Sequence, residues 1–314
     1  MKREMIPTRD GFGEGLLELG RSNNDIVVLS ADLTGSTRAG WFKKEFPDRF
    51  FSFGVAEQNM ASTAAGLSLG GKIPFACTFG VFAAGRAWNQ LSISVCYMDL
   101  NVNIVGTHGG ITVGPDGATH QALEEITLMR ALPNMQVVVP ADAIEARKAT
   151  IQAASIPHPV YLRFTRNPVP IITEEKDYFK IGKANVLKKG NDLTIIACGV
   201  MTHEALYAAA KLKERDNIDA RVINVHTPKP IDKEQLIKAA KETKAILTCE
   251  EHTIYGGLGS AVAEIISEFH PVPIKMIGIK GEFGQSGEPE ELMKFYHLTS
   301  NDIRIAAKKL IKQK

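Results

Sequence analysis

The sequence predicts an α/β protein of two domains, each a mostly parallel sheet flanked by helices. Short apolar runs rich in β-branched residues alternate with Ala- and Leu-rich helical stretches, and glycine or polar residues separate them. Apolar strands that alternate with helices are typical of a parallel sheet covered on both faces. The length of 314 residues is sufficient for two such domains.

The first domain is expected to contain six strands with helices between them. The strands are predicted at residues 26–30, 50–53, 73–77, 102–105, 136–139 and 160–164. The helices are predicted at residues 12–19, 56–69, 82–97, 120–130 and 143–154. Each strand is a short apolar run, and each helix has the length and composition of a surface-covering segment.

The alternation of strands and helices lapses between residues 167 and 191, where two prolines, an acidic pair and a Lys-Lys-Gly-Asn turn occur. We interpret this stretch as a connection with a boundary near Lys180, which gives domains of residues 1–180 and 181–314. Further strands are predicted at residues 193–197, 221–225, 245–248 and 274–277. Further helices are predicted at residues 202–215, 233–242 and 260–269.

The composition argues against several classes of protein. Lys and Arg number 37 against 35 Asp and Glu, so no nucleic-acid footprint or polybasic membrane patch is expected. Cys77, Cys96, Cys198 and Cys249 form no CxxC pair and lie in or beside apolar runs, which predicts buried small hydrophobes. No apolar stretch approaches the roughly 18 residues of a membrane helix, and the first ten residues lack a signal core. We therefore expect the protein to be located in the reducing environment of the cytoplasm.

The segment from Gly106 to His120 is the most informative one for chemistry. It follows a predicted strand, precedes a predicted helix and contains five glycines, at a place where open α/β sheets bind ligands. It also carries two imidazoles and a carboxylate, those of His108, Asp116 and His120. The alternative is a loop whose polar groups satisfy its own backbone. The spacing of the two histidines matches no metal-site pattern.

Two segments closer to the N-terminus carry further candidates. Glu57 follows a predicted strand and falls in the first turn of a helix, where it either complements the helix dipole or serves a site. Phe79 and Phe82 are three positions apart, so they share one face if this segment is helical. They form either part of the core or an aromatic wall for a flat heterocycle.

Arg9, Ser36 and Arg166 stand near predicted turns and strand ends. Arginines at such positions suit a phosphorylated substrate, because guanidinium binds phosphate bidentately; the alternative is a solvated side chain. The sequence has no Walker loop, no Gly-x-Ser-x-Gly and no dinucleotide-binding glycine motif. The turn at residues 255–260, Tyr-Gly-Gly-Leu-Gly-Ser, is interpreted as a strand-to-helix connection.

Six strings taken in order resemble the transketolase family of thiamine diphosphate enzymes. They are IPTRDG, LSADLTGS, GVAEQNM, TFGVF, GTHGGITVGPDGATHQ and RFTRN. The resemblance covers nearly the whole chain and corresponds to the pyrimidine-binding domain followed by the C-terminal domain. It implies transfer of a two-carbon ketol unit from a ketose phosphate to an aldose phosphate.

The resemblance also implies roles for the candidate residues. Glu57 would hydrogen-bond the N1′ nitrogen of the aminopyrimidine and favour the imino tautomer, whose nitrogen removes the thiazolium proton. Phe79 and Phe82 would flank the pyrimidine ring, and Asp32 would lie near the cofactor. Asp116 and His120 would bind sugar hydroxyls, and His120 would also shuttle protons. The residues implied in holding the sugar phosphate are Arg9, Ser36, His108 and Arg166.

Two departures from the family pattern shape the expected assembly. Gly85 stands where another cofactor-facing aromatic residue is expected. Nothing in the sequence matches the family's Gly-Asp-Gly motif and downstream asparagine, which bind the diphosphate and its divalent metal. We therefore expect the C-terminal subunit of a split enzyme, with a separate N-terminal subunit that holds the diphosphate and Mg²⁺. Two such pairs would form a dimer of heterodimers, with pentose-pathway sugars as the default substrates.

Three alternatives remain open. The C-terminal half of a deoxyxylulose phosphate synthase shares similar strings, but an arginine is expected there in place of His108. The beta subunit of a 2-oxoacid dehydrogenase decarboxylase shares the glutamate and lacks the DGATHQ string. A regulatory or structural partner subunit would not require the polar positions that this chain retains.

Overall fold

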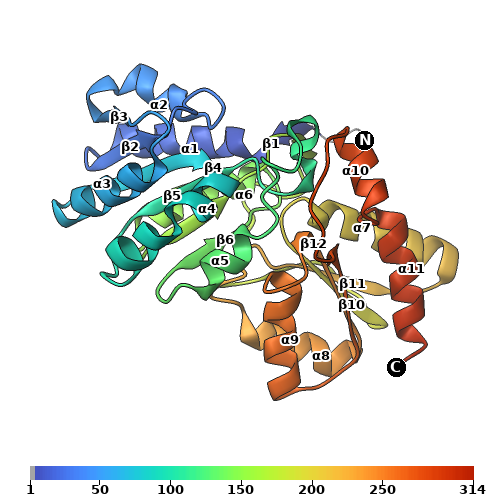
Figure 1. Cartoon of the computed structure of the whole chain (residues 1–314). Coiled ribbons are helices and arrows are strands. Elements are labelled where there is room, and N and C mark those ends of the chain that lie inside the picture. Colours follow the sequence, from blue (N-terminus) through green and yellow to red (C-terminus); the bar gives the residue numbers. More distant parts are fainter. Residues whose placement is uncertain (1–3) are drawn as a thin grey trace.

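The computed structural model describes residues 4–314, which form two helix-flanked sheets and a short two-stranded ribbon (Figure 1). The six-stranded sheet is parallel throughout, with the strand order β3-β2-β4-β5-β7-β6. Its strands are β2 (Ile26–Ser30), β3 (Phe50–Ser52), β4 (Ile73–Phe79), β5 (Asn103–Thr107), β6 (Gln136–Val138) and β7 (Val160–Arg163).

Alternate residues of each strand pack against opposite helical layers. In β2, Ile26 and Val28 face the core formed with α1, α2 and α6, whereas Val27 and Leu29 face α3, α4 and α5. The helices are α1 (Thr8–Ser22), α2 (Ala39–Glu45), α3 (Glu57–Leu69), α4 (Gly80–Gln90), α5 (Glu125–Ala131) and α6 (Ala143–Ala154). Helix α4 continues into a π-helical segment, Leu91–Cys96, and two short 3-10 helices lie at Pro47–Arg49 and Ile111–Asp116.

The second sheet has the order β13-β12-β10-β11-β9, in which only β9 is antiparallel among the strands described. Helices α7 and α11 cover one face, and α8 and α9 cover the other. The strands are β9 (Asn185–Lys188), β10 (Leu193–Ala197), β11 (Ala220–Asn224), β12 (Ile246–Thr253) and β13 (Ile274–Ile279). The helices are α7 (Met201–Asp216), α8 (Lys233–Thr243), α9 (Leu258–Phe269), α10 (Pro289–Phe295) and α11 (Ser300–Ile311).

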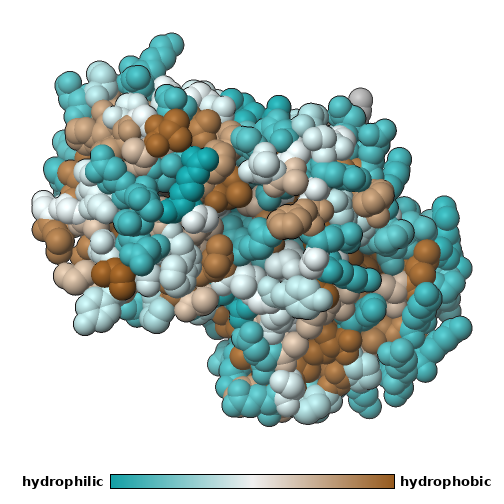
Figure 2. All heavy atoms as spheres, in the orientation of Figure 1, coloured by the Kyte–Doolittle hydropathy of each residue, from teal (hydrophilic) through white to brown (hydrophobic). Residues whose placement is uncertain are grey.

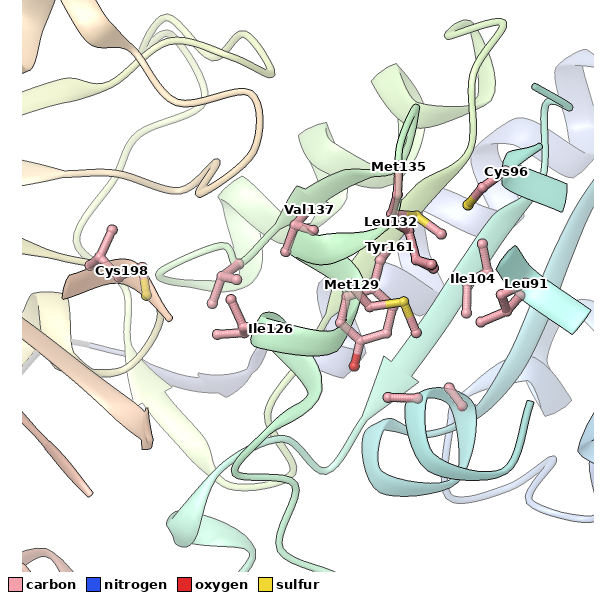
Figure 3. Packing of buried hydrophobic residues seen from close by; sticks show 14 of the residues in the cluster. Leu91, Cys96, Ile104, Ile126, Met129, Leu132, Met135, Val137, Tyr161 and Cys198 are labelled. Carbon is pink, nitrogen blue, oxygen red and sulfur yellow. The ribbon is translucent and has the colours of Figure 1, made fainter. Parts of the chain in front are cut away.

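One apolar core runs through both sheets. The cluster that packs beneath α3, α4 and α5 continues into the face of the second sheet that α8 and α9 cover. Figure 3 shows part of this cluster, from Leu91 and Ile104 across Met129 to Cys198. Because buried apolar surface drives folding, this shared core fixes the two sheets relative to each other.

The α/β fold class predicted from the sequence is confirmed, and each predicted strand and helix has a counterpart. The structure adds elements that the apolar pattern does not predict: β1 (Met5–Pro7), β8 (Pro168–Pro170), β9, α2, α10 and α11. The helix predicted from residue 120 begins only at Glu125, because residues 118–124 form turns and a bridge. The helix predicted over residues 82–97 is divided between α4 and the π-helical segment.

All four cysteines are buried and unpaired, as the sequence predicts. Burial raises the pKa of the Cys96 thiol to about 12, so this thiol is protonated at neutral pH. Within residues 4–314, every helix is too short or too polar to cross a membrane. On the face shown in Figure 2, hydrophilic residues surround several small apolar areas.

Candidate active site

The candidate residues gather at the carboxyl edge of the six-stranded sheet. β2 connects to β3 on one side, whereas β4 and β5 lie on the other side of β2, so the strand order reverses between β2 and β4. Open α/β sheets bind ligands at such a reversal. Phe79 is the last residue of β4, and Asp32, His108 and Arg166 come just after β2, β5 and β7.

Glu57 is the first residue of α3, and only 4% of its side chain is exposed. Residue Ala56 before it provides no side-chain cap, so the carboxylate lies near uncapped amide groups at a helix N-terminus. The Nη1 atom of Arg86, on helix α4, donates a hydrogen bond of 2.8 Å to Oε1 of Glu57. The helix-dipole explanation and the site explanation of Glu57 are thus compatible.

Aromatic rings form a layered wall beside this carboxylate. The rings of Phe79 and Phe82 are stacked, with centroids 5.8 Å apart and planes 15° apart. The imidazole of His108 stacks on Phe79 at 3.8 Å, and the ring of His120 meets Phe82 edge-on at 5.5 Å. This arrangement provides flat apolar surface bordered by two groups that can donate or accept hydrogen bonds.

Gly85 leaves this wall without the third aromatic ring that the family pattern suggests. A Cβ atom at Gly85 would meet no atom within 4 Å, so the position faces open space. The next residue, Arg86, instead places its guanidinium 3.9 Å from the ring centroid of Phe82. The contact with Phe82 follows from the spacing of four residues on the same helix, whereas the contact with Glu57 depends on how α3 and α4 pack together. No sequence pattern therefore indicates that Arg86 pairs with Glu57.

Cationic side chains converge on His108. Arg9, from the first turn of α1, donates a hydrogen bond of 2.9 Å to the Ser36 carbonyl, and its Nη1 lies 3.4 Å from Nε2 of His108. Burial, followed by the charges of Arg9, Arg166 and Arg38, lowers the pKa of His108 to about 3. The imidazole is therefore neutral at physiological pH.

Arg166 and Asp116 form an ion pair of 2.7 Å at the rim of the site, with both side chains partly exposed. His120 is half-buried, and its Nδ1 lies 2.9 Å from the Thr119 hydroxyl. The second ring nitrogen, Nε2, takes no part in this contact. Asp32 is exposed just beyond β2. Among residues 4–314, no hydrogen bond or ion pair joins it to the other candidates. The structure thus connects the aromatic wall, Glu57 and the cationic group, and leaves Asp32 apart.

The glycine-rich loop rests on buried charged side chains. A Cβ atom at Gly109 would lie 2.5 Å from Nε of Arg163, and one at Gly110 would lie 2.3 Å from Cδ of Glu251. Because these neighbours are parts of the chain itself, the two glycines permit close packing of the loop. The sequence-based expectation that glycines here allow approach to a ligand does not account for these two positions.

The charges beneath the loop join the two sheets. Arg163 of β7 donates to Glu125 at 2.5 Å and to Glu251 of β12 at 3.3 Å, and all three side chains are buried. Burial raises the pKa of Glu251, and the charge of Arg163 partly offsets this effect. Sequence reasoning missed this network. The signal for it is Arg163, a charged residue at the end of the apolar strand over residues 160–163.

No group of three His, Cys, Asp or Glu side chains in the described part of the chain is arranged to hold a metal ion. The guanidinium of Arg86 lies over the ring of Phe82 and beside the buried carboxylate of Glu57. Glu57 and the ring of Phe82 are therefore placed to contact a flat, nitrogen-bearing group that stacks and donates a hydrogen bond, as the Arg86 guanidinium does.

Two family models match the chain. The model described as "Transketolase, pyrimidine binding domain" matches residues 4–171, and "Transketolase, C-terminal domain" matches residues 182–303. A "Putative transketolase C-terminal section" from Methanocaldococcus jannaschii is 49% identical and covers 94% of this chain and 93% of its own. A 6-deoxy-6-sulfo-D-fructose transketolase subunit from a Clostridium species is 41% identical, and the match covers 98% of this chain and 95% of the relative. A subunit of the apulose-4-phosphate transketolase from Phocaeicola vulgatus is 40% identical, and the match covers 100% of both chains.

Solved structures resemble the chain over nearly its whole length. One described as "Split gene transketolase, inactive beta4 tetramer" superposes with a TM-score of 0.92 at 50% identity and covers 98% of this chain and 99% of its own. A Campylobacter jejuni transketolase superposes with a TM-score of 0.82 at 23% identity. There the match covers 98% of this chain and 47% of the longer one, and shows the shared fold.

Proposed function

Because this chain belongs to the transketolase family, we propose that it is the C-terminal subunit of a split transketolase, which uses thiamine diphosphate. The reaction is transfer of a two-carbon ketol unit from a ketose phosphate to an aldose phosphate. The observation that carries this proposal is the buried carboxylate of Glu57 beside the stacked rings of Phe79 and Phe82. Residues 1–180 form the pyrimidine-binding domain and residues 181–314 the C-terminal domain.

Glu57, Phe79 and Phe82 are the residues that hold the pyrimidine ring. The carboxylate of Glu57 holds a proton against the ring nitrogen, and its burial strengthens that hydrogen bond relative to one in water. The two phenylalanines exclude water from the ring face. Bound thiamine diphosphate supplies the carbon nucleophile for ketol transfer, and Asp32 lies near the cofactor.

Arg9, Ser36, His108 and Arg166 bind the phosphate end of the sugar. Guanidinium groups bind phosphate oxygens bidentately, and His108 in its neutral form donates or accepts one hydrogen bond. Asp116 and His120 bind sugar hydroxyls, and His120 moves a proton at Nε2. His120 borders the aromatic wall, so this nitrogen is close to where the sugar would react.

A separate N-terminal subunit holds the diphosphate and Mg²⁺, and two such pairs assemble as a dimer of heterodimers in the cytoplasm. The relatives whose length this chain matches are named as a section or as subunits. Exposed apolar side chains also support a partner surface: Val55, two positions before Glu57, is 70% exposed, and Tyr97, at the end of the π-helical segment, is 81% exposed. Pentose-pathway sugars are the default substrates. The named substrates of the relatives, a sulfofructose and apulose 4-phosphate, are the first alternatives.

The test is reconstitution of this chain with a candidate N-terminal subunit, followed by assay of ketol transfer, pyruvate decarboxylation and deoxyxylulose phosphate synthesis. We expect ketol transfer alone, and we expect it only from the mixture. Glu57→Gln should nearly abolish turnover while the melting temperature changes little. The matched control is Glu45→Gln, which changes an exposed glutamate that pairs with Arg21. Pyruvate-dependent activity, or full turnover by Glu57→Gln, would refute the proposal.

A further inference from the structure

Arg86 makes two contacts that a flat cofactor ring would also make. Its guanidinium donates a hydrogen bond of 2.8 Å to Glu57 and lies 3.9 Å from the ring centroid of Phe82. A guanidinium is planar, stacks on aromatic faces and presents N–H donors in its own plane. An aminopyrimidine beside the same two residues would use the same carboxylate and the same ring face.

We propose that Arg86 occupies the position of the pyrimidine ring in the isolated subunit, and that it must release Glu57 and Phe82 before the ring binds. This inference rests on the function proposed above, because it assumes that Glu57 and Phe82 hold the ring. Arg86 is then an internal competitor of the cofactor. It weakens cofactor binding and also satisfies a carboxylate that would otherwise be buried without a partner.

The surroundings of Arg86 allow it to leave. Its side chain is 47% exposed, whereas that of Glu57 is 4% exposed, so the arginine can move toward solvent without opening the core. Gly85, directly before it on α4, borders open space where another residue would place a side chain. An ion pair with one half-exposed partner is weak, so binding energy from the cofactor can displace it.

Because Arg86 and the ring compete, Glu57 has two states, one paired with Arg86 and one paired with the ring. While Arg86 donates its hydrogen bond of 2.8 Å, Oε1 of Glu57 already has a hydrogen-bond partner and is not available to a second donor in the same place. A ring nitrogen that shares a proton with Glu57 requires the arginine to be elsewhere. Release of Arg86 therefore accompanies binding of the ring. In the isolated subunit Glu57 stays paired with Arg86.

The test compares wild-type protein with Arg86→Ala and Arg86→Lys, each in complex with the N-terminal subunit. The probes are thiamine diphosphate with Mg²⁺ and, separately, inorganic pyrophosphate, with dissociation constants measured by calorimetry. Arg86→Ala should bind thiamine diphosphate about 3- to 30-fold more tightly, the range that a half-exposed ion pair and a cation–π contact provide. Arg86→Lys, which keeps the charge without the planar group, should fall between the two. Binding of pyrophosphate should be unchanged, because it contacts the partner subunit.

A second readout uses the isolated chain without cofactor. Arg86→Ala should lower its melting temperature by about 2–4 °C, because Glu57 loses its partner. Arg21→Ala, which removes an exposed Arg–Glu pair on α1 and α2, is the matched control and should change neither readout. Equal or weaker thiamine diphosphate binding by Arg86→Ala, with normal wild-type binding, would overturn the role of Arg86 alone. Wild-type binding that Glu57→Gln leaves unaffected would overturn the proposed function as well.

Discussion

The hydroxyl of Thr112 donates a hydrogen bond of 2.7 Å to Glu251, which joins the loop above the first sheet to strand β12 of the second. The backbone amide of Thr112 donates to the same carboxylate at 3.2 Å. Gln121 makes a second connection, from its amide nitrogen to the Gln285 carbonyl at 2.9 Å. The loop that carries His108, Asp116 and His120 is therefore braced by the C-terminal half of the chain.

Removing the buried acid of this brace should destabilise the fold strongly. Glu251→Ala leaves Arg163 with Glu125 as its remaining carboxylate partner in a buried setting, so we expect a loss of about 3–5 kcal/mol in the free energy of unfolding. Urea unfolding followed by circular dichroism measures this change. Glu264→Ala removes an exposed carboxylate from an ion pair with Arg130 and should cost less than about 1 kcal/mol. Similar losses for both variants would contradict the bracing role.

His108 should make the protein sensitive to acid. Its pKa is about 3 in the folded chain, mainly through burial, against about 6.5 when unfolded, so only the unfolded state takes up this proton between these values. Its contribution to stability is complete above pH 6.5 and is lost as the pH falls through that window, by about 1.4 kcal/mol per pH unit.

Replacing His108 by Gln should therefore flatten the pH dependence of stability. Unfolding free energies measured from pH 7 to 4.5 should fall less steeply for His108→Gln than for the wild type. In the wild type, NMR signals of the His108 ring should not titrate between pH 5 and 8. Parallel stability curves for the two proteins would show that folding does not lower the pKa of His108.

Gly109 should tolerate no side chain. A methyl group there would lie 2.5 Å from Nε of the buried Arg163, so Gly109→Ala should lower stability by about 1–3 kcal/mol. Gly85→Ala is the matched control: its Cβ meets open space within helix α4, and alanine should stabilise the helix by about 0.5–1 kcal/mol. Thermal melts of the two variants should therefore shift in opposite directions, and a loss at Gly85 would be the contrary result.

Arg166 should matter for phosphorylated substrates and little for stability. Its pair with Asp116 is partly exposed, so Arg166→Ala should change the free energy of unfolding by less than about 1 kcal/mol. If Arg166 binds the sugar phosphate, KM for the ketose phosphate should rise about 10- to 100-fold, as expected for a lost charge-assisted hydrogen bond. Steady-state kinetics with the corresponding sugar lacking phosphate is the comparison. An equal rise in KM for both sugars would remove Arg166 from phosphate binding.

Much of the fold could be predicted from local pattern. Strands β2 and β10 begin and end where expected, since each is a run of five buried residues between polar or glycine breaks. Helix α6 also has the predicted bounds, because the Asp142 side chain caps it by accepting from the Glu145 amide. Strand β9 is absent from the prediction, because it is a partly exposed antiparallel edge strand without a clear apolar alternation.

For the candidate site, the sequence proposes a set of residues but not the contacts between them. The ordered strings identify Glu57 and the two phenylalanines, but the pairing of Glu57 with Arg86 joins residues 29 positions apart on different helices. The sequence predicts a strand over residues 245–248, which stops short of the charged run Glu250-Glu251-His252. The strand continues to Thr253, since Arg163 and nearby backbone amides satisfy those buried polar groups.

The short ribbon of β1 and β8 has a consequence for the architecture of longer polypeptides. Met5 lies opposite Pro170 in this antiparallel pair, so the first fold unit is entered and left at neighbouring points. A unit whose ends meet can be joined to a further module without distorting its sheet. A module attached ahead of this unit would therefore lie beside the segment that leaves it for the second sheet.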